Sequence, residues 1–319
     1  MIDRMRSVPD DRNAVKTIGP KTSERGSLSR PAPSRTAGRS ARDWVADGSP
    51  SDLPAWVPEV LQESPVSVAH RMVRIPDAAT LPAEVMEEAV REAYRELLDG
   101  LAPSELLRVW NFIPRINDPA SRDRVESGSD RDRYMVFNAG RFRGFEDVMG
   151  SPVRYPVASG VGHAGDDLIV HLLHGAGEPR LVDNPRQVPP DAYSRRYGDP
   201  PPVFARAAVV RWPGREALLI SGTASVVGEE SAHEDAFGAQ LQETMRNLEV
   251  LVERGWPGAR VADLQDWLVY LPDDRHESLV RRTIGDRPEV VVRRQRLCRP
   301  ELLVEIECAG FRPLDGDPA

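Results

Sequence analysis

Lysine and cysteine are almost absent from this sequence of 319 residues. The two lysines are Lys16 and Lys21, so arginine supplies nearly all the positive charge, and the formal net charge is −8. An acidic chain without a basic field is a poor match for nucleic-acid binding as a main activity. The two cysteines, Cys298 and Cys308, come late in the chain and have no neighbouring Cys–His cluster. That pattern argues against a disulfide framework and against a zinc site.

Long hydrophobic runs are also lacking. No apolar stretch approaches the roughly 18 residues that span a bilayer, and the first residues have no continuous apolar core of the secretory-signal type. The HExxH, Walker, Rossmann and Gly-x-Ser-x-Gly motifs are absent as well. We therefore expect a cytoplasmic protein that has neither a membrane partner nor a nucleic-acid partner and holds no metal.

Composition divides the chain into a tail and two halves. Residues 1–52 are rich in Ser, Arg, Pro and Gly and offer little to bury, so they are predicted to be disordered. The acidic residues of this tail disfavour a transit peptide. The ordered part is predicted to consist of an N-terminal domain, 53–180, and a C-terminal domain, 181–319. The second domain opens with a long proline-rich loop, and loops of that length in compact domains are usually functional or disordered.

Hydrophobic periodicity predicts the same order of elements in both halves: helix, strand, helix, strand, strand. The expected helices are 82–100, 131–149, 235–255 and 275–285. The expected strands are 106–114, 155–162, 166–175, 203–212, 216–228, 263–272, 289–297 and 301–307. The fold class that follows is α+β, with two copies of one unit, each a mixed β-sheet with two helices packed on one face.

One carboxylate stands out in the last predicted strand, "ELLVEIE". Strand alternation places Leu302, Val304 and Ile306 on one face and Glu305 and Glu307 on the other. Glu305 then points either to water or into a cavity. A carboxyl group in an apolar cavity has a raised pKa and can act as a general acid near neutral pH. Periodicity does not decide between the two, and for Glu307 a surface position is the simpler interpretation.

The proline-rich loop and the strand after it carry arginines beside an aromatic residue. Arg195, Arg196 and Arg206 lie near Tyr193, and arginine forks bind carboxylates in bidentate fashion. A small anionic ligand would suit this group, whereas a solvated loop paired with local aspartates is the alternative.

Two further positions have both a chemical and a structural interpretation. Gly222, in "ISGTASVVG", allows either close approach of a ligand to the backbone or a β-bulge. Cys298 lies beside Arg296 and Arg299, which would lower the pKa of its thiol, but a lone cysteine in a strand is more often a small core residue.

Five stretches in chain order resemble the chorismatase family. They are "RVWNFIPRIN", "RYMVFNAGR", "DNPRQVPPDAYSRRYGDPPPVFARA", "ISGTASVVG" and "CRPELLVEIE". Together they run from about residue 105 to about residue 308. The resemblance implies that each half has the α+β fold of the RidA (YjgF) type.

The resemblance also implies roles for individual residues. Glu305 takes the place of the catalytic acid, and Cys298 stands at a second catalytic position that goes with the choice of product. Tyr193 and Arg206 match positions that hold the substrate, with Arg206 on a carboxylate, and Arg196 lies in the same motif.

Gly222 completes the implied site, because the combination of this glycine with Cys298 is typical of the relatives that form 3-hydroxybenzoate. One departure is Glu229, which stands where the family often has a histidine.

The implied activity is cleavage of the enolpyruvyl ether of chorismate to 3-hydroxybenzoate and pyruvate, through protonation by Glu305 and displacement by the ring hydroxyl. The resemblance implies no cofactor, chorismate as the small-molecule partner, and a monomer or homotrimer. Three alternatives stay open. They are hydrolysis to 3,4-dihydroxycyclohexa-1,5-dienoate, a non-catalytic RidA-like module that binds a small anion, and RidA-type enamine hydrolysis.

Overall fold

The computed structural model describes residues 15–17, 53–54, 57, 68–120, 131–151, 153–177, 179–285 and 290–314. Of the tail predicted to be disordered, residues 1–52, it describes Val15–Thr17, which form strand β1, and the rest of that prediction lies outside the described residues. In the described part of the chain, no helix combines the length and the apolar character that a bilayer crossing needs.

The first unit is a five-stranded sheet with two helices. The strand order is β1-β2-β5-β3-β4. The strands after β1 are β2 (Val68–Ile75), β3 (Leu106–Pro114), β4 (Val157–His163) and β5 (Leu168–Gly175), and the helices are α3 (Ala83–Leu98) and α5 (Arg133–Met149). Strands β3 and β4 pair in parallel, whereas β5 is antiparallel to both β2 and β3.

The second unit is a six-stranded sheet of order β12-β11-β13-β8-β7-β6. Its strands are β6 (Arg180–Val182), β7 (Ala207–Trp212), β8 (Arg215–Ala224), β11 (Asp266–Leu271), β12 (Val290–Arg294) and β13 (Glu305–Pro313). Its helices are α6 (Phe237–Gly255) and α7 (Glu277–Ile284), and β9 (Val226–Val227) with β10 (Glu230–Ser231) forms a small separate ribbon.

The two units repeat one topology. The order β4-β3-β5-β2 in the first sheet matches β12-β11-β13-β8 in the second, and in each the strand after the first helix pairs in parallel with the strand after the second helix. The predicted fold class is therefore confirmed: two α+β units, each a mixed sheet with two helices on one face. Sequence periodicity did not predict β2, the first strand in chain order of the topology that the two units share.

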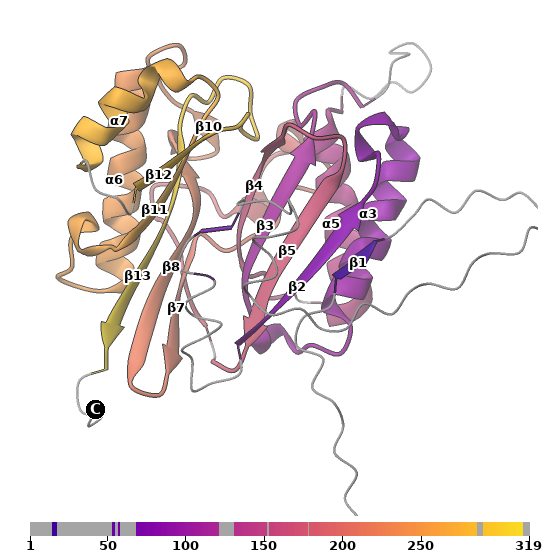
Figure 1. Cartoon of the computed structure of the whole chain (residues 1–319), viewed down its shortest axis with the longest axis horizontal. Helices are drawn as coiled ribbons and strands as arrows, with labels where there is room; N and C mark the ends of the chain where they lie inside the picture. Colours follow the sequence, from indigo (N-terminus) through magenta and orange to yellow (C-terminus); the bar gives the residue numbers. More distant parts are fainter. Residues whose placement is uncertain are drawn as a thin grey trace, which may run out of the picture.

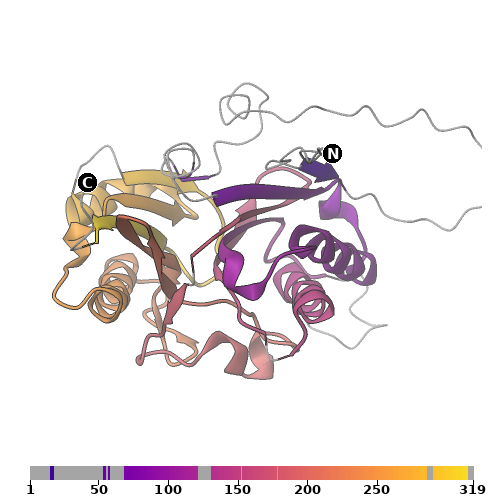
Figure 2. The same ribbon diagram turned by 90° about the horizontal axis from the view of Figure 1, so that it is seen from below.

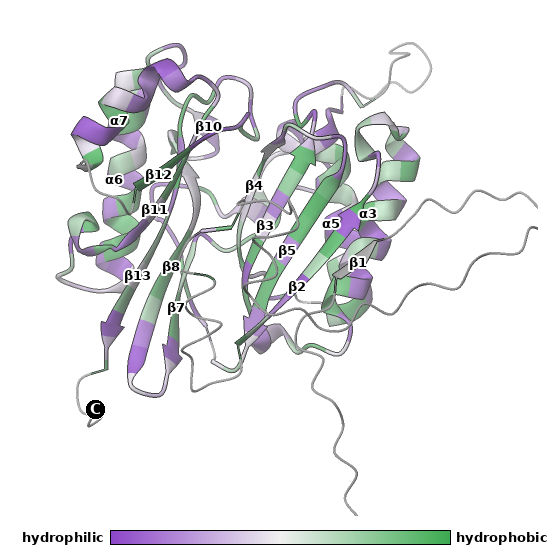
Figure 3. Cartoon of the chain, viewed as in Figure 1, coloured by the Kyte–Doolittle hydropathy of each residue, from purple (hydrophilic) through white to green (hydrophobic). Residues whose placement is uncertain are grey.

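The helices lie on the outer faces of the sheets, and the inner faces share one core. Figures 1 and 2 show α3 and α5 on the face of the first sheet that is turned away from the second sheet. They show α6 and α7 on the face of the second sheet that is turned away from the first. Apolar residues from β2, β3 and β5 meet those from β7, β8 and β11 in a single cluster between the sheets. Figure 3 shows the hydrophobic colouring that runs along the strands of both sheets.

The segment before β13 differs from the prediction. A strand was expected over 301–307, but β13 begins at Glu305, and the preceding residues form a turn and an extended stretch. The cause is Gln240 of α6, whose amide donates to the carbonyl of Glu301 at 2.9 Å and accepts from the N–H of Leu303 at 2.8 Å. A side chain thus takes up backbone groups that a strand would pair with its neighbour.

The units join where β4 of the first sheet approaches β8 of the second. The N–H of Gly222 on β8 donates to Oγ of Ser159 on β4 at 2.8 Å. A parallel bridge links Val157 to Ala205 at the same junction. Backbone and side-chain hydrogen bonds therefore fix the relative position of the residues that both units contribute to this region.

We predict that Gly140→Ala lowers the free energy of unfolding by about 1–3 kcal/mol, because overpacking two helices forces them apart. A Cβ at Gly140 on α5 would overlap the carbonyl of Glu87 on α3 and lie 2.8 Å from Cβ of Val90. Denaturant unfolding measures the change. Gly238→Ala in α6 is the control, since a Cβ there meets nothing within 4 Å, and it should be neutral or slightly stabilising. Equal effects of the two changes would contradict the close approach of α3 and α5.

Candidate active site

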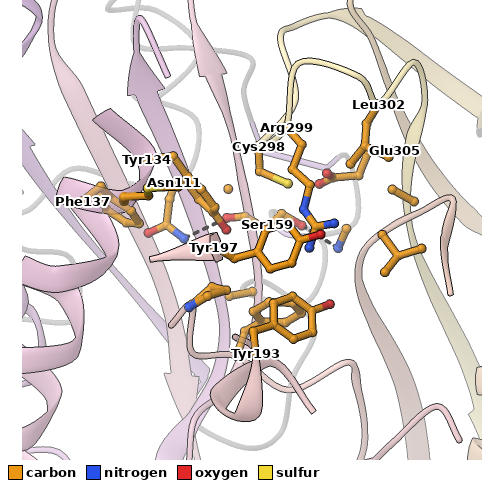
Figure 4. Close-up of a pocket in the computed structure, with 18 of the residues that line it drawn as sticks. Asn111, Tyr134, Phe137, Ser159, Tyr193, Tyr197, Cys298, Arg299, Leu302 and Glu305 are labelled. Atoms are coloured by element: carbon orange, nitrogen blue, oxygen red, sulfur yellow. Dashed lines mark hydrogen bonds between the residues drawn. The ribbon is translucent and has the colours of Figure 1, made fainter. Parts of the chain in front are cut away.

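A cavity of about 250 Å³ opens at the junction of the two units. Its walls come from β3, β4, β8 and β13, from α5, from the loop 187–206 and from the turn 298–302. All six residues predicted from the sequence line it: Glu305, Cys298, Tyr193, Arg206, Arg196 and Gly222. Figure 4 shows Cys298, Arg299 and Glu305 on one side of the cavity and Tyr134, Asn111 and Phe137 on the other.

Glu305 is the first residue of β13 and points into this cavity. It pairs with Ala224 of β8 and Tyr270 of β11, and it is 3% exposed. Burial, and then the negative charge of Glu307, raises the pKa of Glu305 to about 8, and Arg108 opposes them. Glu305 therefore carries its proton at neutral pH. Of the two orientations left open by strand alternation, the structure has the inward one.

Gly222 makes room for this acid. A Cβ at Gly222 would overlap Oε1 of Glu305 and lie 2.7 Å from its Cδ. Oγ of Ser159 would lie 3.1 Å away, so neither neighbour leaves space for a side chain. The glycine in the small-residue strand is thus explained by the carboxyl group that packs against it.

Glu307 is not the surface residue that the sequence suggested. It is 3% exposed, because the inner face of β13 is covered by the first sheet. Its side chain accepts hydrogen bonds from Arg108, Ser159, Trp110 and Tyr270. Strand alternation correctly placed Glu305 and Glu307 on one face, but a single-sequence pattern does not reveal a second sheet above that face.

Tyr193 and Arg206 lie together, as the shared motif implied. Nη2 of Arg206 donates to the hydroxyl of Tyr193 at 2.8 Å and to the carbonyl of Val188 at 3.0 Å. The Arg206 guanidinium also lies 5.3 Å from the centre of the Phe204 ring. These contacts hold a permanent positive charge against the cavity wall.

Arg196 stands at the mouth of the cavity. Its guanidinium donates to Glu230 at 2.6 Å, and the hydroxyl of Tyr197 donates to the same carboxylate at 3.0 Å. Glu229 accepts the N–H of Ser194 at 2.7 Å, so this residue ties the loop to the turn between β9 and β10.

Arg299 is a cavity residue that sequence reasoning considered only as a neighbour of Cys298. Its Cζ lies 3.7 Å from the centre of the Tyr197 ring and 5.5 Å from that of Tyr193. Nη1 donates to the carbonyl of Glu229 at 2.8 Å and to Ser231 at 3.1 Å. Sequence patterns gave no signal for Arg299, because it lies between two expected strands. The turn that brings its side chain to the cavity was not predicted.

Arg141 on α5 ends the stretch "RYMVFNAGR", but sequence reasoning gave it no role. It is 3% exposed, and its Nε and Nη2 have no hydrogen-bond partner among the described residues. Its guanidinium lies 5.6 Å from the ring of Tyr94 and 5.5 Å from that of Phe145. A buried cation without a carboxylate is costly unless an anion joins it. An arginine on the apolar face of a predicted helix, four residues after Phe137, was the available signal.

The neighbouring arginines suggested a lowered pKa for the thiol of Cys298, but in the structure this pKa is raised. Burial, and then the Glu305 carboxyl group, raises the pKa of the thiol to about 12, while Arg299 only partly opposes this. Arg296 contributes little because its side chain extends to solvent, 3.8 Å from Asp118. Cys298 is therefore a neutral thiol at neutral pH, and a thiolate nucleophile is not supported.

Metal-binding geometry is not found in the described part of the chain: no three His, Cys, Asp or Glu side chains there are grouped to hold an ion. The chemistry that the cavity offers is instead one protonated carboxyl group, one neutral thiol and several guanidinium groups. That combination suits acid catalysis on an anionic substrate.

We predict that Glu305→Gln becomes increasingly more stable than the wild type as the pH rises from about 4.5 to 8. The folded pKa of Glu305, about 8, exceeds its ordinary value of 4.5, so the folded state binds this proton more tightly than the unfolded chain does. Its contribution to stability is full below about pH 4.5 and is lost as the pH rises toward 8. The free energy of unfolding of the variant, relative to that of the wild type, should rise by about 1.4 kcal/mol per pH unit over part of this range. Urea unfolding at pH 5, 7 and 9 measures the difference.

The control for this prediction is Glu216→Gln. Burial alone would raise the pKa of Glu216, but hydrogen bonds from Arg211 and Arg312 bring it below the ordinary value. Replacing that carboxylate should therefore destabilise the protein at neutral pH. A Glu305→Gln difference that does not change with pH would show that the acid is ordinarily solvated.

Comparison with known proteins agrees with this geometry. Residues 62–174 match the family described as "Chorismatase FkbO/Hyg5-like, N-terminal". A 3-hydroxybenzoate synthase of Streptomyces hygroscopicus is 33% identical in an alignment of 241 positions that covers 69% of this chain and 68% of that protein. A chorismatase of Streptomyces rapamycinicus is 29% identical in an alignment of 250 positions that covers 74% of this chain and 72% of that protein.

A solved structure shares the fold. A chorismatase crystal structure superposes with a TM-score of 0.65 at 24% identity, covering 76% of this chain and 74% of that one. On the sequence similarity to the 3-hydroxybenzoate synthase, the chain belongs to the chorismatase family.

Proposed function

We propose that this chain cleaves the enolpyruvyl ether of chorismate to 3-hydroxybenzoate and pyruvate. One observation carries the proposal: Glu305 is a buried carboxyl group with a pKa of about 8, in a cavity that four arginines line. Membership of the chorismatase family supports the substrate, and the 3-hydroxybenzoate synthase of Streptomyces hygroscopicus supports the product.

The cations of the cavity suit a substrate with two carboxylates. Arg206 and Arg299 come from the second unit, whereas Arg141 comes from α5 of the first. Positive charge is thus available on two walls. We propose that Arg206, with Tyr193, binds one carboxylate of chorismate and that Arg141 binds the other.

The reaction then uses the proton of Glu305. Protonation of the methylene carbon of the enol ether produces an oxocarbenium-like centre, which the new Glu305 carboxylate stabilises in a medium of low dielectric. The neighbouring ring hydroxyl displaces pyruvate from the adjacent ring carbon, so its oxygen bridges two ring carbons and releases its proton. The bond from this oxygen to its original carbon then breaks as the oxygen takes up a proton again. Loss of the hydrogen from the carbon that keeps the oxygen makes the ring aromatic. The two products together contain every atom of chorismate, so the reaction consumes no water, and the released ring proton restores Glu305.

Cys298 and Gly222 fit supporting roles in this scheme. The neutral thiol of Cys298 lies on the same side of the cavity as Glu305 and is a weak hydrogen-bond donor that can guide the loss of the ring proton. Gly222 lets the Glu305 carboxyl group reach the cavity, because a Cβ at position 222 would overlap Oε1 of Glu305.

Both units of the chain contribute residues to the cavity wall. The oligomeric state, monomer or homotrimer, stays a prediction. Both cysteines are free, which agrees with the proposed cytoplasmic location.

Incubation of the pure protein with chorismate, followed by chromatography of the products, tests the proposal. We expect 3-hydroxybenzoate and pyruvate in equal amounts, and we expect Glu305→Gln to lower kcat by at least about 10²-fold while binding survives. Formation of 3,4-dihydroxycyclohexa-1,5-dienoate would assign the hydrolytic reaction instead. Chorismate that stabilises the wild type but stays unchanged would contradict the proposal and favour a binding module.

We predict that Arg141→Met lowers kcat/KM by about 10²-fold or more, because removing one member of a buried charge pair costs roughly 2–5 kcal/mol. Steady-state kinetics measures the loss. Arg143→Met is the matched control: this arginine lies on the same helix but pairs with Glu87 at the surface, so turnover should not change. Equal activity of the two variants would remove Arg141 from the substrate site.

A further inference from the structure

Two carboxyl groups lie side by side on β13, and their surroundings differ. Glu305 and Glu307 are two residues apart on the strand face that looks toward the first sheet, and each is 3% exposed. Two buried carboxylates so close together do not both ionise readily. The proposed function needs the proton to be on Glu305, and the structure contains a reason why it is there.

The surroundings of Glu307 suit an anion. Arg108 and Ser159 donate to its Oε2, while Trp110 at 3.0 Å and Tyr270 at 3.1 Å donate to its Oε1. An arginine guanidinium and a tryptophan N–H are donors only. Both oxygens of Glu307 are therefore acceptors, and Arg108 supplies a matching positive charge inside the protein.

The surroundings of Glu305 suit a neutral acid. No hydrogen bond to its carboxyl group is found among the described residues, and this group packs against the backbone of Gly222. The same strand thus presents one carboxyl group that is fully hydrogen-bonded and one that is only desolvated. Pairs of acids in such contrasting environments have pKa values that move apart.

Three titratable side chains near Glu305 carry no charge at neutral pH. Burial raises the pKa of Tyr134 on α5 and of Tyr270 on β11, and burial also raises the pKa of Cys298 in the turn. The cavity arginines are cations, but the charges that shift the pKa of Glu305 are those of Glu307 from its own strand and Arg108 from β3. Of these two, Glu307 has the larger effect.

We propose that Glu307 is a positioning residue whose fixed negative charge, held in place by Arg108, keeps the catalytic proton on Glu305. This inference rests on the proposed function for what the proton does. It adds a consequence for turnover: once Glu305 has given up its proton, two buried carboxylates face each other, and their repulsion favours rapid recapture of the ring proton. Ser159 ties this pair to the cavity, because its Oγ donates to Glu307 and accepts from the N–H of Gly222.

Infrared spectroscopy on the wild-type protein tests the placement of the proton without any substrate. The C=O band of a protonated carboxylic acid should be present at pH 7, disappear in Glu305→Gln and titrate near pH 8. No second carboxylic-acid band that depends on Glu307 should be present at pH 7. An ionised Glu305 at pH 7, or a proton on Glu307, would overturn the proposal even if no variant of Glu307 folded.

Variants of the pair test the cause. In Glu307→Gln the pH at which Glu305 loses its proton should fall by about one to two units, because the negative neighbour is gone and Arg108 remains. The double variant Arg108→Met/Glu307→Gln removes both buried charges, which proteins often tolerate, and its shift should have the same direction but a smaller size. The alkaline limb of the kcat/KM profile should move with each infrared titration.

Tyr270→Phe is the matched control, because it removes a neutral donor from Glu307 and leaves the charge in place. Its alkaline limb should stay within about half a pH unit of the wild type. If Glu307→Gln and Tyr270→Phe shift the limb equally, or if both lower kcat without shifting it, Glu307 has only a structural role. A wild type that binds chorismate without turnover would overturn the proposed function, whereas the infrared titration would still decide this inference.

Discussion

The cost of placing a carboxyl group between two sheets is the constraint on which the site depends. Glu305 has too little water around it to ionise at neutral pH, and this gives it a proton to donate. The same burial destabilises the fold at higher pH, and the large apolar core between the sheets offsets that loss. Stability and acidity are therefore linked at one residue, and a more solvated position would lose the acid.

Of the two repeated units, only the second contains the acid Glu305. Phe112 on β3 and Tyr270 on β11 each stand two residues before a proline, at equivalent places in the two units. Phe112 pairs with Ile169, whereas Tyr270 pairs with Glu305. An apolar residue in the first unit thus corresponds to the acid in the second. The first unit contributes Arg108, Ser159 and Arg141 instead, so the two copies are complementary parts of one site.

Sequence patterns predicted the units and the acid but not the partners of the acid. Helical and strand periodicity are local, and they located the four helices and the face that Glu305 and Glu307 share. Contacts between the sheets are not local: Arg108 reaches Glu307 across 199 positions, and Gly222 reaches Ser159 across 63. The turn before β13 depended on one side chain of α6, Gln240. The contacts of Arg108 and Gly222 arise only when the two units pack together, and the turn arises from packing within the second unit.

Neutron diffraction from a crystal of the wild-type protein grown near pH 7 locates individual deuterons and so shows which carboxyl group holds the proton. We predict a deuteron on an Oε atom of Glu305 and none on Glu307, whose oxygens should accept from Arg108, Trp110 and Tyr270. A bare Glu305 carboxylate, or a deuteron on Glu307, would contradict it.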